Sequence, residues 1–308
     1  MKDFFRLIKI KHWTKNIFFI YAPLIFSLNL FDIKKLFYST LTVISFSFVS
    51  VLVYIINDIK DKENDKIHPE KSKRPIASGR ISIILALIIG IIFFIVGLFI
   101  SFLVGIKITL IVLLYLIINL LYTFFIKNII IVDVFFIAIG FCLRVLIGAV
   151  AINVELSNWM IFSTFFISLF LGFGKRRNEI VLLGDEALNH RSNYREYKKE
   201  IIDFFIIITA SITAIGYSLY TMDMKVMEKL HTNNLLYTVP FVLYGLFRYL
   251  YLIYGKNKGG NPEDIVLKDP GIIITVLLWA FFVIFFIYFR NINIFNELNF
   301  SFFTIFKK

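Results

Sequence analysis

Long apolar blocks, separated by short charged segments, recur along the whole chain. A helix needs about 20 mostly apolar residues to cross about 30 Å of hydrocarbon, and nine stretches near this length can be read in the sequence. The composition agrees, because 59% of the residues are apolar and only 18% are charged, whereas a soluble domain has about a quarter charged residues. We therefore predict an all-α integral membrane protein, a single polytopic domain over residues 1–308 with about nine transmembrane helices near residues 17–31, 37–57, 82–104, 108–126, 129–151, 157–174, 201–221, 234–254 and 271–290.

The distribution of Lys and Arg predicts the orientation in the membrane. With the N-terminus in the cytoplasm, the cytoplasmic segments hold 23 of the 33 Lys and Arg and the outer segments hold eight. Because basic residues accumulate in cytoplasmic loops, we predict a multi-pass protein of the cell (inner) membrane with its N-terminus and active site on the cytoplasmic side. The net charge of +12 then faces anionic lipid, and no nucleic-acid partner is expected.

The first long cytoplasmic loop, residues 58–80, carries a spaced row of acids. Asp58, Asp61 and Asp65 lie at i, i+3 and i+7, so their carboxylates project from one face if the preceding helix continues past the apolar block. Like charges repel one another unless a cation neutralises them. Hard oxygen ligands suit Mg²⁺, with Mn²⁺ as an alternative. A solvated loop with interleaved Asp and Lys is the competing interpretation.

The residues around this acidic row favour a metal site. Asn57 precedes the acids, and Lys73 and Arg74 follow them. Metal-binding acids beside phosphate-binding bases are the layout of a site for a Mg²⁺-bound polyphosphate. His68, which stands before Pro69, is expected to be a turn residue rather than a metal ligand.

This loop resembles the first aspartate-rich motif of the UbiA-type membrane prenyltransferase superfamily. It is most similar to the branch of decaprenyl-phosphate, or polyprenyl-phosphate, phosphoribosyltransferases. The shared pattern, residues 57–79, is Asn-Asp-x-x-Asp-x-x-x-Asp followed by His-Pro-x-Lys-x-x-Arg-Pro-Ile-Ala-x-Gly. The resemblance runs from about residue 6 to 200 and implies a UbiA-like helical bundle with a cytoplasm-facing site; the last three spans match only in hydropathy and number.

The second long cytoplasmic loop, residues 175–199, departs from the pattern of the prenyl-transferring branches. Those members resemble one another in a second spaced-Asp motif, whereas this loop is basic. One acidic and one basic loop fit two separately phosphorylated substrates. If the segment is helical, Glu179 can brace the cations three and four residues before it. The residues that match the branch and are assigned to substrate binding are Lys175, Arg176, Glu179, His190, Arg191 and Tyr194.

Several polar residues lie in or at the ends of the predicted spans, where ionisable groups mark functional sites. Arg144 stands eleven residues after Asp133, which places it about 16 Å deeper at 1.5 Å per residue. We therefore expect Arg144 to meet an acid from another helix or a substrate phosphate, in a polar cavity. Four further residues are assigned to substrate binding: Tyr122 and Lys127 near the inner boundary, and Lys15 and Asn16 at the inner start of the first span, although snorkelling towards the interface would explain Lys15 equally well.

The resemblance implies Mg²⁺-dependent transfer of 5-phosphoribose from 5-phosphoribose 1-diphosphate to a polyprenyl phosphate, with release of pyrophosphate. The three Asp are expected to hold the Mg²⁺-pyrophosphate, and Lys73 and Arg74 a donor phosphate. The alternatives are transfer of a prenyl group from its diphosphate to an aromatic acceptor on the same fold, and a secondary transporter. A homo-oligomer is compatible with the sequence.

Overall fold

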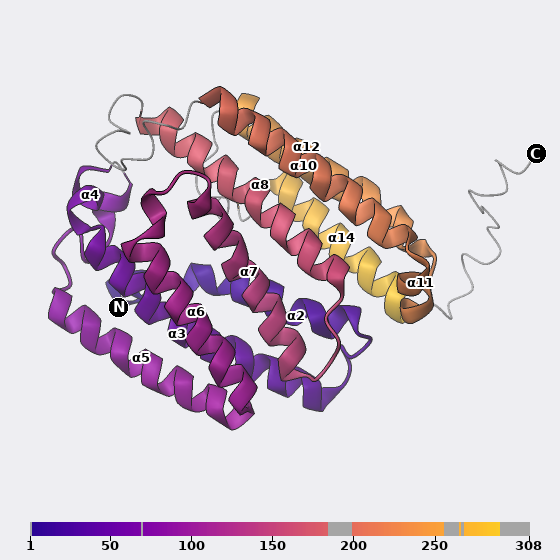
Figure 1. Ribbon diagram of the computed structural model, residues 1–308, viewed down its shortest axis with the longest axis horizontal. Coiled ribbons are helices and arrows are strands. Elements are labelled where there is room, and N and C mark those ends of the chain that lie inside the picture. Colours follow the sequence, from indigo (N-terminus) through magenta and orange to yellow (C-terminus); the bar gives the residue numbers. More distant parts are fainter. Residues whose placement is uncertain (1, 69, 184–198, 256–264, 266–267, 290–308) are drawn as a thin grey trace, which may run out of the picture.

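The computed structural model describes residues 2–68, 70–183, 199–255, 265 and 268–289, and these residues form helices and turns with no strand. Within these described residues, nine long helices build the bundle in Figure 1, and each overlaps one of the predicted apolar blocks. They are α2 (Trp13–Phe26), α3 (Ile33–Lys60), α5 (Ile83–Val104), α6 (Ile106–Phe124), α7 (Val132–Ala151), α8 (Asn158–Leu183), α10 (Lys199–Met222), α12 (Val239–Gly255) and α14 (Pro270–Tyr288).

Short helices and 3₁₀ turns lie at the two ends of the bundle. They are α1 (Lys2–Leu7), η1 (Ile10–His12), α4 (Lys62–Ile67), η2 (Lys71–Lys73), η3 (Ile126–Asn128), α11 (Met224–Leu230) and η6 (Asn234–Thr238).

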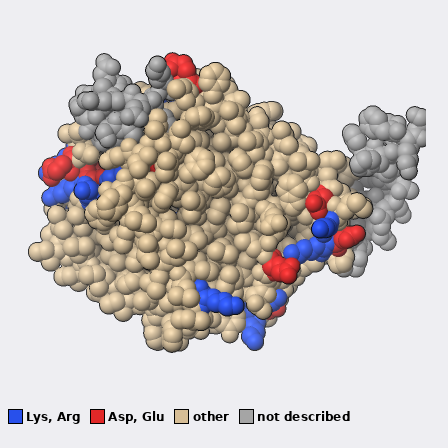
Figure 2. Space-filling model, in the orientation of Figure 1, with Lys and Arg blue, Asp and Glu red and all other residues tan. Residues whose placement is uncertain are grey.

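Seven of the described helical segments are long and apolar enough to cross a membrane: α3, α5, α6, α7, α10, η6 with α12, and α14. The remaining two long helices, α2 and α8, are not among them. The 14 residues of α2 span only about 21 Å at 1.5 Å per residue. The all-α membrane-type architecture is confirmed, while the count of nine spans stays a prediction. Figure 2 shows an uncharged body with Lys, Arg, Asp and Glu gathered towards its ends.

Two apolar cores share helix α7. The first core joins α2, α3, α6 and α7, with Ile20, Phe46 and Ile147 at its centre. The second joins α7, α8, α10, α12 and α14. Because α7 contributes to both, it holds the N-terminal and C-terminal halves of the bundle together, and its first turn carries Asp133, which belongs to the candidate site.

Candidate functional site

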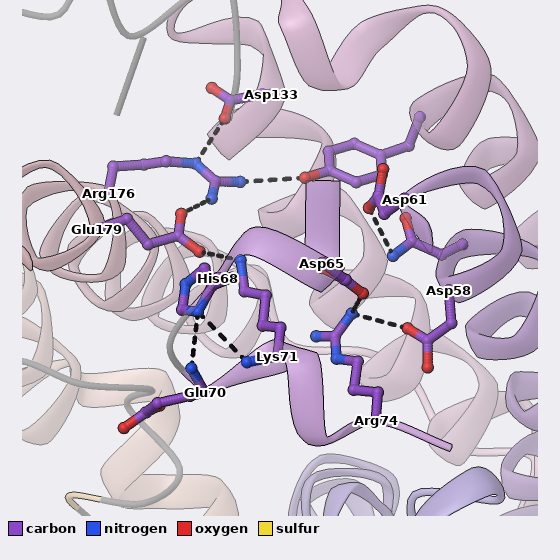
Figure 3. Close-up of polar contacts among 12 residues, drawn as sticks. Asp58, Asp61, Asp65, His68, Glu70, Lys71, Arg74, Asp133, Arg176 and Glu179 are labelled. Atoms are coloured by element: carbon purple, nitrogen blue, oxygen red, sulfur yellow. Dashed lines mark hydrogen bonds and ion pairs between the residues drawn. The ribbon is translucent and has the colours of Figure 1, made fainter. Parts of the chain in front are cut away.

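Two carboxylates of the acidic row converge on one arginine. The Nη1 atom of Arg74 donates to Asp58 Oδ1 at 2.9 Å and to Asp65 Oδ2 at 2.7 Å (Figure 3). Asp58 lies on the last turns of α3, and Asp65 lies on α4. Asp58 also accepts from Lys9 Nζ at 2.7 Å. Both carboxylates are 3% exposed, so the two acids point at the same buried position, and protein cations neutralise them there.

The third acid of the row has separate partners. Helix α3 ends at Lys60, and Asp61 stands between α3 and α4 with φ −94° and ψ 4°. The helix therefore continues only one turn beyond the apolar block, and the single uninterrupted face that the spacing would allow is broken at Asp61. The Asp61 carboxylate accepts from Asn57 Nδ2 at 3.1 Å and from the buried Lys127 of η3.

A second cluster surrounds Arg176, on the last turns of α8. Its Nε donates to Asp133 Oδ2 at 2.7 Å, its Nη1 to Glu179 Oε2 at 2.7 Å, and its Nη2 to Tyr122 Oη at 3.0 Å. The predicted bracing of Arg176 by Glu179 is confirmed. Arg176 is 2% exposed, and it ties α6, α7 and α8 together at the end of the bundle that carries the acids.

An ion pair connects the two clusters. Lys71, in the 3₁₀ turn η2 of the first loop, donates from Nζ to Glu179 Oε1 at 3.0 Å (Figure 3). The acidic loop and the α8 segment, which lie more than a hundred residues apart in the chain, therefore form one continuous polar site. The turn that presents Lys71 is held by His68, whose Nδ1 accepts the backbone N–H groups of Glu70 and Lys71. His68 thus has the turn role expected of it.

Burial shifts the pKa values of two groups in the site in opposite directions. Burial raises the pKa of Asp65 above its usual range, and the Arg74 charge opposes this shift. Burial lowers the pKa of Lys9, although Asp58 favours its charged form. Both shifts reflect the cost of removing a charge from water.

The structure divides the predicted site residues into groups. Nine of them meet at the site: Asn57, Asp58, Asp61, Asp65, Arg74, Tyr122, Lys127, Arg176 and Glu179. Lys73 is exposed and forms no ion pair with the described residues. Lys175 is half-buried on α8. His190, Arg191 and Tyr194 lie outside the described residues.

Three further predicted residues lie deeper in the bundle. Arg144 Nε donates to Asn16 Oδ1 at 2.7 Å, and both side chains are buried. Lys15 lies beside them, with its Nζ 5.7 Å from the Phe141 ring centroid. The acid partner expected for Arg144 as one alternative is not found, because no carboxylate of the described residues forms an ion pair with it.

Sequence reasoning missed three partners. Lys9 precedes its acid by 49 residues, and nothing in local spacing indicates such a pair. Asp133, near the inner boundary, was not assigned to the site, yet it is fully buried against Arg176. Lys71 is one of the bases that follow the acidic row, but only Lys73 and Arg74 were assigned to substrate binding.

The acidic row has the donor chemistry of a Mg²⁺ site. Its carboxylate oxygens are hard ligands, and Asp58 and Asp65 already converge on the Arg74 nitrogen. In the arrangement described here, no group of three or more His, Cys, Asp or Glu side chains among the described residues stands ready to hold a metal. Binding would therefore require the pairs with Lys9, Arg74 and Lys127 to open.

The model of the UbiA prenyltransferase family matches residues 17–263. The chain belongs to this family. It is therefore a membrane transferase, and membership favours an enzyme over a secondary transporter.

Relatives in the UbiA family include decaprenyl-phosphate phosphoribosyltransferases. That of Corynebacterium glutamicum is 27% identical over 286 residues, which cover 90% of this chain and 84% of the relative. That of Mycobacterium tuberculosis is 26% identical over 277 residues, covering 89% and 90%. These alignments thus extend well beyond residue 200, further than the stretch of about residues 6 to 200 over which the resemblance was expected to run.

Solved structures share the UbiA fold with this chain. A UbiA homolog from Archaeoglobus fulgidus bound to GPP and Mg²⁺ has a TM-score of 0.68 at 19% identity, covering 92% of this chain and 99% of that one. The same homolog has also been solved with Cd²⁺, with a TM-score of 0.64. At these identities the likeness shows the fold.

Proposed function

We propose that this UbiA-family enzyme transfers 5-phosphoribose from 5-phosphoribose 1-diphosphate to a polyprenyl phosphate and releases pyrophosphate. The single observation that carries the proposal is the Lys71–Glu179 pair, which joins the acidic row to the Arg176 cluster. Carboxylates that suit a metal-bound diphosphate, joined to the cations Lys71 and Arg176 that suit a second phosphate, fit two phosphorylated substrates. The names of the phosphoribosyltransferase relatives support the same reaction.

In this proposal Asp58, Asp61 and Asp65 would hold Mg²⁺ and through it the pyrophosphate of the donor. The bound ion supplies positive charge that stabilises the leaving group. Asn57 would donate to the same pyrophosphate. Because the ion would take over the carboxylates, Arg74 could turn its guanidinium to a donor phosphate, with Lys73 beside it at the surface.

The acceptor reacts as an anion and requires no strong general base. A phosphate oxygen attacks C1 of the ribose, the bond from C1 to the pyrophosphate oxygen breaks, and the electron pair leaves with pyrophosphate. Lys175 and Arg176 would bind phosphate of the ribose or of the acceptor, and Arg191 and Tyr194 are proposed for the same role. Burial of the site would exclude water, which would otherwise compete as nucleophile. We place the site at the cytoplasmic face of the inner membrane, where a soluble donor meets a lipid.

The test is an assay with radiolabelled 5-phosphoribose 1-diphosphate and decaprenyl phosphate, using purified protein in lipid nanodiscs. Labelled lipid is expected with Mg²⁺ and not after chelation. Asp61→Asn should lower the rate at least a hundredfold, because it removes a charge from the metal row. Asp223→Asn, at the opposite end of the bundle, is the matched control and should retain the rate.

Two results would contradict the proposal. Full activity of Asp61→Asn would remove the metal assignment. Absence of labelled lipid, with product formed from a prenyl diphosphate and an aromatic acid, would select the alternative reaction on the same fold.

A further inference from the structure

Arg144 differs from every other buried cation of the described residues. Four Lys and Arg side chains are buried there: Lys127, Arg144, Arg176 and Arg177. Lys127 pairs with Asp61, Arg176 with Asp133 and Glu179, and Arg177 with Asp203. Arg144 has no carboxylate partner among the described residues, although it lies within a membrane-type helix, where an uncompensated charge is costly.

Neutral groups hold the Arg144 guanidinium in place without neutralising it. Besides Asn16 Oδ1, it donates to Gly140 O at 2.6 Å and to Tyr115 Oη at 3.2 Å. The rings of Phe46, Tyr115 and Phe141 have centroids 5.0–5.1 Å from Cζ. These contacts use three of the five N–H groups of a guanidinium. No described residue accepts the second N–H of either terminal nitrogen, and such a pair of donors is what a phosphate takes from arginine.

A row of polar side chains leads from the acidic site down to Arg144. Asn57 and Ser50 lie seven residues apart on α3, and Tyr122 and Tyr115 lie seven apart on α6. Seven residues are about two helical turns, so each pair shares a face and spans about 10 Å. Ser50 Oγ donates to Tyr115 Oη at 3.4 Å, and that tyrosine contacts Arg144. The cation therefore lies about 10 Å below the acidic row, towards the middle of the membrane-type helices.

A second cation lies close to the first. Lys15 and Arg144 both flank the Phe141 ring, at 5.7 Å and 5.0 Å from its centroid. Asn16, the neighbour of Lys15, bonds to both Arg144 and Ser47. A buried Arg144 with no acid partner among the described residues, and a second cation beside the same ring, favour an anion such as a phosphate monoester.

We propose that Arg144, with Lys15, forms the binding site for the phosphate of the lipid acceptor. The identity of the lipid as polyprenyl phosphate rests on the proposed function. Depth selects the lipid over the soluble donor: the donor's pyrophosphate belongs to the acidic row at the polar end, whereas a lipid head on an apolar tail reaches a position between membrane-type helices.

The experiment measures binding without turnover. The wild-type chain in phosphatidylcholine nanodiscs is heated with decaprenyl phosphate, with decaprenol, or with ribose 5-phosphate. Decaprenyl phosphate is expected to raise the apparent melting temperature more than decaprenol does. Arg144→Gln should abolish this difference, Arg144→Lys should retain part of it, and the effect of ribose 5-phosphate should be unchanged.

Control variants separate the charge from the tether between helices. Tyr115→Phe removes one hydrogen bond to Arg144 and leaves the charge, so it should lower stability yet keep the difference between the two lipids. Lys15→Gln leaves the hydrogen bonds of Arg144 intact and should at least halve that difference, which keeps the test decisive even if Arg144→Gln does not fold.

Three outcomes would contradict this binding site for the lipid phosphate. One is a phosphate-dependent shift that survives Arg144→Gln, or, where this variant does not fold, survives Lys15→Gln undiminished. The second is an Arg144→Gln variant that loses only the rise in melting temperature caused by ribose 5-phosphate, which would assign the position to the soluble donor. The third is a Tyr115→Phe variant in which the difference between decaprenyl phosphate and decaprenol is lost as fully as in Arg144→Gln, which would make Arg144 a structural tether. The wild-type chain could also bind decaprenyl phosphate in an Arg144-dependent way and yet form no labelled lipid. This result would support the binding site and refute the proposed reaction.

Discussion

At the scale of single residues, the buried charges of the described residues, apart from Arg144, are paired, and most of the pairs join different elements. Asp58 meets Lys9 from the N-terminal segment, and Asp133 of α7 meets Arg176 of α8. Removing one partner of such a pair by substitution leaves an uncompensated buried charge. The resulting loss of folding free energy is far larger than the contribution of a surface ion pair. Substitutions at the site therefore need matched variants that separate lost chemistry from lost stability.

Asp269, the residue that precedes helix α14, allows the effect of one charge on stability to be measured apart from catalysis. Asp269 caps α14 by accepting the Ile272 N–H at 3.0 Å, and it also pairs with Arg248. The hydrogen bond from Arg248 lowers the pKa of Asp269. A carboxyl group whose pKa is lower in the folded than in the unfolded state stabilises the fold at pH values above its unfolded-state pKa, about 3.9. This contribution is lost as the pH falls through the folded-state pKa.

Asp269→Ala should therefore cost about 1 kcal/mol at pH 7 through loss of the cap, with activity retained. Asp269→Asn keeps an acceptor and should cost less. Apparent melting temperatures at pH 7 and pH 3 check this: the gap between wild type and Asp269→Asn should narrow at pH 3. A gap that widens on acidification would contradict the assigned direction.

At the scale of elements, the close contact of α2 with α7 brings Asn16 to Arg144. A Cβ built on Gly148 of α7 would overlap the backbone carbonyl of Ile20. Glycine is therefore required here by backbone proximity, and a side chain would push α2 away from the α7 face that carries Arg144.

Gly148→Ala should lower stability by about 1–3 kcal/mol because the helices cannot both keep their positions. Gly245→Ala is the matched control: its Cβ would meet only Thr275 Cγ2, at 3.9 Å, and alanine is the better helix former. Melting temperatures of the two variants in the same detergent provide the comparison. Equal stability of the two would show that α2 adjusts freely against α7.

At the scale of the whole molecule, charge gathers at the ends of an apolar bundle, and the site occupies one end (Figure 2). The excess of Lys and Arg predicts that this end faces the cytoplasm. Lys62 of α4 belongs to the site end, and Lys229 of α11 belongs to a segment predicted to lie outside.

Cysteine labelling tests this orientation, because Cys142 is the only cysteine of the chain. In a Cys142→Ser background, Lys229→Cys should react with a membrane-impermeant thiol reagent in cells whose inner membrane is intact. Lys62→Cys should react only after that membrane is permeabilised. The reverse pattern would invert the topology and place the acidic row outside.

The amino-acid sequence by itself determined the helical membrane class, the approximate helix positions and the acidic row. These follow from local properties, since the length of an apolar block and the spacing of charges along one helix are readable without tertiary contacts. The helix bounds shifted by several residues at α2 and α8, where polar residues lie inside helices and apolar content no longer marks the ends.

Only the tertiary structure decided which cation meets which acid. The spacing of Asp58, Asp61 and Asp65 indicates a possible shared face, but Lys9, Arg74 and Lys127 reach them from three other segments. Local periodicity fixes the direction of a side chain relative to its own helix, whereas a partner depends on how helices distant in the chain pack. For the same reason the sequence could mark Arg144 as unusual, and only the packing of α2, α3, α6 and α7 showed it surrounded by neutral groups.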